Sequence, residues 1–63
     1  MPTEIKNLKI GDRFTETGLP CRILIVEKYI ESIDLIVARD LHGWGQCFNP
    51  DDLVYLLEEW NGV

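Results

Sequence analysis

The sequence contains little cysteine and no long apolar run. Cys21 and Cys47 are its two cysteines, fewer than the disulfide framework of a secreted domain of this length usually has. No apolar run approaches the roughly 18 residues that span a bilayer. The first twelve residues also lack the basic-then-apolar pattern of a signal peptide. We therefore expect a cytoplasmic protein with reduced thiols and no membrane partner.

Basic residues are scarce as well. The chain has six Lys and Arg against eleven Asp and Glu, which gives a formal net charge of −5. Binding to nucleic acid requires a cluster of cations that displaces counterions from phosphates. Here the basic residues stand singly, each with an acidic residue within a few positions. The sequence therefore predicts no nucleic-acid partner, whereas the acidic balance fits a basic protein partner.

Motifs for metal binding and catalysis are missing. Structural zinc sites usually contain paired ligands such as Cys-x2-Cys, whereas Cys21, His42 and Cys47 are separated in the sequence. A nucleophile made from Cys47 and His42 would need a water-excluding pocket, for which a domain of 63 residues has little room. The adjacent Asp51 and Asp52 point apart in a helix or a strand. We expect no enzyme, no catalytic residue, no metal and no cofactor.

What the sequence does contain is the pattern of one small all-β domain over residues 1–63. Turn-forming residues recur about every 8–12 positions, the spacing that such domains show. The segments between them are rich in Ile, Leu, Val and aromatic residues. The expected strands cover residues 13–17, 21–30, 35–41 and 44–48.

Asp40-Leu41-His42-Gly43 predicts a tight hairpin turn. Asp suits the first position of a type I turn because its carboxylate can accept hydrogen bonds from the following backbone. Gly at the fourth position can adopt the left-handed conformation that forms a bulge and returns the chain. The strand from Trp44 to Phe48 should then pair with the strand before the turn.

Two interpretations remain open for residues 50–60. Asn49 could cap a helix from about Pro50 to Trp60, since Pro suits the first helical position and acidic residues favour the first turn. Alternatively, a 3-10 turn at Pro50–Leu53 leads into a strand at Val54–Leu57 that closes a sheet edge. The second interpretation predicts an all-β barrel, and the first predicts a four-stranded sheet with a C-terminal helix.

The order of these motifs resembles the small SH3-like β-barrels of bacteria and phages. The resemblance is carried by "LKIGDRF", a Gly-containing turn, a long β run, a D-x-x-G turn, an F-x-P-D step and a final V-x-L strand. It implies a five-stranded SH3-like barrel with a 3-10 turn before the last strand, and it brings no catalytic residues. Barrels of this kind often bind extended peptides through exposed aromatic residues beside acidic loops.

Four aromatic residues are therefore the candidate protein-binding surface: Tyr29, Trp44, Tyr55 and Trp60. Tyr and Trp are the side chains that most often anchor interfaces. In the alternative interpretation, Trp44 covers the open end of the barrel and Trp60 packs on the N-terminal segment.

We expect a non-enzymatic acidic protein-binding or regulatory module, encoded by a bacterium or phage as an accessory protein. The alternative is an assembly subunit that associates through an exposed strand edge such as residues 34–38. Under these hypotheses the chain is a monomer or a weak homodimer.

Overall fold

The chain folds into an all-β structure in a computed structural model that describes residues 2–17 and 22–57. Its strands are β1 (Thr3–Glu4), β2 (Arg13–Thr15), β3 (Ile23–Ile30), β4 (Leu35–Asp40), β5 (Gly45–Phe48) and β6 (Leu53–Leu56), and the 3-10 helix η1 (Ile5–Asn7) follows β1. The all-β prediction is confirmed. Within these residues, no helix has both the length and the apolar character needed to cross a bilayer.

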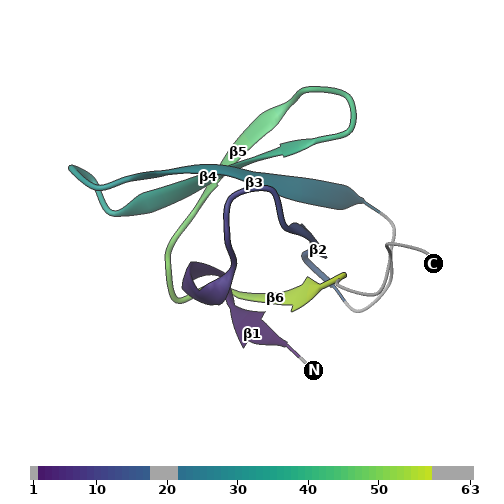
Figure 1. The fold of residues 1–63 in the computed structure, drawn as a ribbon, viewed down its shortest axis with the longest axis horizontal. Helices are drawn as coiled ribbons and strands as arrows, with labels where there is room; N and C mark the ends of the chain where they lie inside the picture. Colours follow the sequence, from purple (N-terminus) through teal and green to yellow (C-terminus); the bar gives the residue numbers. More distant parts are fainter. Residues whose placement is uncertain (1, 18–21, 58–63) are drawn as a thin grey trace.

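The six strands form one antiparallel sheet in the order β1-β6-β2-β3-β4-β5. Figure 1 shows β3, β4 and β5 on one side of the molecule and β1 and β6 on the other, so the sheet folds over on itself. In the described part of the chain, β1 and β5 end the order without pairing to each other. The sheet is therefore open and has six strands, where the sequence predicted a five-stranded barrel.

The prediction that residues 34–38 form an exposed edge of the sheet is wrong. These residues belong largely to β4, which pairs with β3 on one side and β5 on the other. Ala38, for example, lies opposite Val26 and also opposite Gln46. An interior strand has no free backbone groups to offer a partner, so the described edges of the sheet are β1 and β5 instead.

The long strand β3 connects the two sides of the sheet and contains a β-bulge. Its first residues pair with β2, while its whole length runs beside β4. Its pairing with β4 shifts between Val26 and Lys28, which leaves Glu27 as an extra residue. A bulge bends its strand and increases the local twist.

The core lies between the two sides of the folded sheet. Buried apolar side chains come from η1 and from every strand except β1: Ile5, Phe14, Leu24, Val26, Ile36, Ala38, Phe48 and Val54. The rings of Phe14 and Phe48 meet edge to face with centroids 5.5 Å apart. This contact joins β2 to β5, two strands that are not neighbours in the sheet.

The C-terminal segment is a strand, so the helix interpretation is wrong for the described residues. The chain turns at Asn49–Asp52, where the Asp52 N–H donates to the Asn49 carbonyl at 3.0 Å. β6 then pairs with β1 on one side and β2 on the other. These long-range pairings, together with the burial of Val54, outweigh the local preference for a helix. A 3-10 helix lies at η1, and the tight turn expected before the last strand spans Asn49–Asp52, one residue earlier than the sequence predicted.

The predicted hairpin turn is confirmed. Gly43 has a φ of 92° and donates its N–H to the Asp40 carbonyl at 3.1 Å. The Asp40 carboxylate accepts hydrogen bonds from the N–H groups of His42 and Trp44 at 2.9 and 3.0 Å. Desolvation alone would raise the pKa of Asp40, but these two bonds and the Arg22 guanidinium outweigh it and lower the pKa below its usual value. The carboxylate that holds the turn is therefore ionised at neutral pH.

Candidate protein-binding groove

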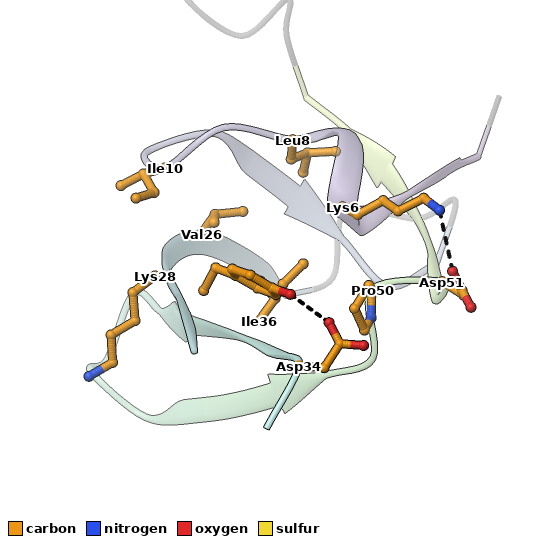
Figure 2. Close-up of a pocket in the computed structure, with 10 residues that line it drawn as sticks. Lys6, Leu8, Ile10, Val26, Lys28, Asp34, Ile36, Pro50 and Asp51 are labelled. Carbon is orange, nitrogen blue, oxygen red and sulfur yellow. Dashed lines mark hydrogen bonds and ion pairs between the residues drawn. The ribbon is translucent and has the colours of Figure 1, made fainter. Parts of the chain in front are cut away.

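An apolar groove of about 490 Å³ opens between the N-terminal segment and the β3–β4 hairpin. Figure 2 shows the side chains that converge on it from η1, the following loop, β3, β4 and the turn before β6. Its lining residues are Lys6, Leu8, Ile10, Val26, Lys28, Tyr29, Asp34, Ile36, Pro50 and Asp51. Six of the ten are apolar or aromatic, and the charged residues leave a mixed polar border, a composition typical of binding sites.

The bulge in β3 places Tyr29 in this groove. Tyr29 lies directly opposite Ile36, and residues opposite each other in a sheet share a face. Ile36 belongs to the core, whereas Tyr29 remains 52% exposed. Beyond the bulge, the inner face of the hairpin thus extends past the core and offers its apolar side chains to the groove.

The opposite wall is held by backbone hydrogen bonds. Ile5 and Lys6 donate their N–H groups to the carbonyls of Asp52 and Pro50 at 2.8 and 3.1 Å. The following turn is fixed to β3, because Gly11 donates to the Val26 carbonyl at 2.9 Å. Both walls are therefore attached to the sheet, and the groove is already formed without an occupant.

Two apolar side chains at this end of the molecule are open to solvent. Ile10, in the lining, is 71% exposed, and Ile33, in the turn of the β3–β4 hairpin, is 57% exposed. Single exposed apolar side chains are ordinary on a protein surface. Together with Tyr29 they give this end of the molecule a concentration of apolar surface, which is a mark of interaction sites.

One border of the groove carries an ion-pair cluster. The Lys6 ammonium lies 3.5 Å from a Glu4 carboxylate oxygen and 3.6 Å from an Asp51 carboxylate oxygen. The charge of Glu4, and then that of Asp51, raises the pKa of Lys6 above its usual value. The Lys6 ammonium therefore stays charged, and two carboxylates of the same chain already pair with it.

Tyr29 and Asp34 form a hydrogen-bonded pair at the hairpin end of the groove. The Tyr29 hydroxyl donates to Asp34 Oδ1 at 2.6 Å. This bond, followed by desolvation and the Asp34 charge, raises the pKa of Tyr29, so the phenol stays protonated at neutral pH. The bond also restricts the ring to one orientation over the groove.

Two of the predicted aromatic residues, Tyr29 and Trp44, lie at different places on the sheet. Trp44 lies in the β4–β5 hairpin, where its carbonyl accepts from the Asp40 N–H. Trp44 therefore lies beside Asp40, whereas Tyr29 lies beside Ile36, four residues earlier in β4. At the usual rise per residue, the two aromatic residues are separated by roughly 13 Å along the strands. Trp44 is 71% exposed, so it does not cover the end of the sheet.

Tyr55 is not among the residues that line the described groove. Tyr55 is partly buried in β6 opposite Thr15. Side chains alternate along a strand, so Tyr55 faces away from the core-facing Val54. Trp60 lies outside the described residues. Of the three predicted aromatic residues that the structure describes, Tyr29 alone lines this groove.

The sequence interpretation missed the other groove residues. No sequence pattern assigned Leu8, Ile10, Asp34 or Pro50 to a binding surface. One signal was present, since Ile10 is a large apolar residue directly before a Gly-Asp turn. The bulge that turns Tyr29 toward the groove is not indicated by any residue pattern in the sequence.

The residues weighed for metal or thiol chemistry lie on the β4–β5 hairpin or outside the described chain. Cys47 is a free, exposed thiol in β5, and His42 lies in the turn. Cys21 falls outside the described residues. Within residues 2–17 and 22–57, no three His, Cys, Asp or Glu side chains are grouped so that they could hold a metal ion.

Comparison of the chain with protein-family models, curated proteins and solved structures found no match in any of the three.

Proposed function

We propose that this chain is a non-enzymatic module that binds an extended segment of another protein in the groove between η1 and the β3–β4 hairpin. The observation that carries the proposal is the groove itself, preformed, mostly apolar and bordered by charge. Tyr29 provides a rigid aromatic surface within it, and such residues often anchor interfaces. A regulatory or accessory role in the cytoplasm of a bacterium, or in a phage-infected cell, is part of the same proposal.

We also propose that the fold is of the SH3-like barrel type. It is supported by the consecutive pairing of β2, β3, β4 and β5, with β6 returning beside β2. It is further supported by the bulge that bends β3. In this description β1 is an added strand outside β6.

A protein partner fits the charge of the molecule better than nucleic acid does. The net charge is −5, and Lys6 at the groove is already engaged by two carboxylates. Grooves that hold single strands are positively charged in addition to having aromatic side chains. We therefore propose no nucleic-acid partner, and an oligonucleotide titration at physiological salt is the control for every binding measurement below.

The groove can be tested with peptides selected from a random display library against the immobilised protein. For the tightest selected peptide, Ile10→Asp should weaken binding about tenfold, because a carboxylate would replace an apolar contact and lose hydration when the peptide binds. Isothermal calorimetry measures the change. The matched control is Leu41→Asp, which alters an equally exposed apolar residue (66% against 71%) in the β4–β5 hairpin.

Two outcomes would contradict the assignment of the groove as the peptide-binding site. If Leu41→Asp weakens the selected peptides and Ile10→Asp does not, the binding surface is the end that carries Trp44. If no library peptide binds either end, the proposed peptide-binding function is wrong.

A second candidate function, assembly through a strand edge, is favoured by the position of β5. In an antiparallel pair, hydrogen-bonded and non-bonded residue pairs alternate. The Asp40 N–H donates to the Trp44 carbonyl, so Trp44 stands at a hydrogen-bonded position. By the alternation, the backbone groups of Gln46 also bond to β4. The backbone N–H and carbonyl groups of Gly45 and Cys47 therefore point away from β4. Among the described strands, none covers this side of β5, so a second copy could add its own β5 here.

Cys47→Pro should abolish any such self-association without unfolding the protein. Proline removes an N–H that points away from β4, and edge positions of this kind tolerate it. Sedimentation velocity at increasing concentration measures the effect. Cys47→Ala is the matched control, because it removes the thiol and keeps the N–H. A dimer that survives Cys47→Pro, or a wild-type chain that is monomeric at every concentration, contradicts assembly through β5.

A further inference from the structure

The groove has an unmatched negative charge at its hairpin end, provided by Asp34. Asp34 Oδ1 accepts the Tyr29 hydroxyl, a neutral donor that leaves the charge in place. Among the described residues, no side chain forms a hydrogen bond or ion pair with Oδ2. One carboxylate oxygen beside the aromatic ring is therefore free to accept from an incoming group.

The cations of the groove do not neutralise this carboxylate. Lys6 is held by Glu4 and Asp51, on the side of the groove formed by η1 and the turn before β6. In Figure 2 the Lys28 ammonium extends away from the apolar side chains and from Asp34. Glu31 adds a further acidic residue to the same hairpin turn. The field at this end of the groove is negative, in line with the net charge of −5.

Asp34 occupies a backbone conformation that does not explain the choice of an acidic residue. Its φ is 54°, in the left-handed region, where Gly is unstrained and Asn is as well tolerated as Asp. The turn would therefore form with a neutral residue at this position. What Asp supplies beyond Gly is an oxygen that accepts from Tyr29. What it supplies beyond Asn is a negative charge beside the groove.

We propose that the groove selects a protein segment in which a Lys or Arg follows or precedes an apolar anchor residue by one to three positions. This inference rests on the proposed function of the groove. The anchor packs between Ile10 and Ile36, while the cation donates to Asp34 Oδ2 and lies beside the Tyr29 ring. An ammonium or guanidinium near an aromatic face gains a further electrostatic attraction.

A second copy of this chain is a poorer occupant. Two molecules that each carry a charge of −5 repel each other, and that repulsion opposes self-association at low ionic strength. A basic partner segment is instead attracted to the acidic end of the groove before it makes contact.

Asp34→Asn tests the inference, because Asn keeps the turn conformation and an oxygen that can accept from Tyr29, while removing the charge. With the tightest library peptide, this variant should weaken binding about fivefold at low salt. The loss should shrink as salt rises toward about 0.5 M, since salt screens exposed charges. A peptide whose Lys and Arg are replaced by Gln should bind wild type and variant equally, and thermal melting verifies that the variant is folded.

The outcomes separate this inference from the function on which it rests. If Ile10→Asp weakens the peptide and Asp34→Asn does not, the groove binds but does not select a cation, and the inference is wrong. The inference also fails if the selected peptides contain no Lys or Arg near an apolar residue. If neither variant changes binding, the groove is not the binding site and both proposals are wrong.

Discussion

Phe14→Ala should lower the free energy of unfolding by about 3–5 kcal/mol. Phe14 has no exposed surface and contacts Phe48 across the core. Truncating a buried Phe to Ala typically costs about 3–5 kcal/mol, from lost burial and from the cavity that remains. A domain of this size has a total stability of roughly 3–9 kcal/mol at the usual value per residue. If the total stability lies in the lower half of this range, this one substitution removes most or all of it.

Urea unfolding followed by circular dichroism measures this loss. Ile33→Ala serves as the control, because Ile33 is 57% exposed in a turn, where substitutions usually change stability by less than about 0.5 kcal/mol. A Phe14→Ala variant that unfolds cooperatively within about 1 kcal/mol of the wild type contradicts the central position of this ring in the core.

Local signals were sufficient to predict the β4–β5 hairpin and the all-β class. The Asp40–Gly43 turn was predictable because a turn of four residues depends on the conformations of those residues alone. The strands before and after it were predictable from runs of β-branched and aromatic residues. Each of these features is determined by neighbours in the sequence.

Features that depend on distant residues were not predictable. β1 has only two residues and exists through its pairing of Thr3 with Val54 and Glu4 with Leu53. The same pairing, with that to β2, makes β6 a strand although its sequence is suitable for a helix. The edge at residues 34–38 was misplaced for the same reason, since only the strand order shows that β4 lies between two neighbours.

The site was predicted in part, through Tyr29. Aromatic composition identified this residue, but it could not show which aromatic side chains share a face. That depends on the bulge between Val26 and Lys28, because one extra residue moves every later side chain of the strand to the other face. The apolar residues that line the groove with Tyr29 come from the N-terminal loop, from β3 and β4 and from the turn before β6, and only the folded sheet brings them together.

The final prediction concerns Gly43, whose replacement by Val should cost about 1–3 kcal/mol of stability. Gly43 has a φ of 92°, and a Cβ built there meets no atom within 4 Å. The expected loss therefore comes from backbone strain in a β-branched residue and not from a collision. It should act on the whole fold, because this turn determines how β5 returns and so where Phe48 enters the core.

Two matched variants separate strain from a general effect of adding a side chain. Gly45→Ala, two residues further along the same hairpin, places a Cβ at an ordinary 3.8 Å from Arg39 Nη1 and needs no left-handed backbone. It should therefore leave stability nearly unchanged. Gly43→Asn should lose less than Gly43→Val, because Asn tolerates positive φ. Equal urea midpoints for Gly43→Val and the wild type would show that the turn does not require a left-handed residue.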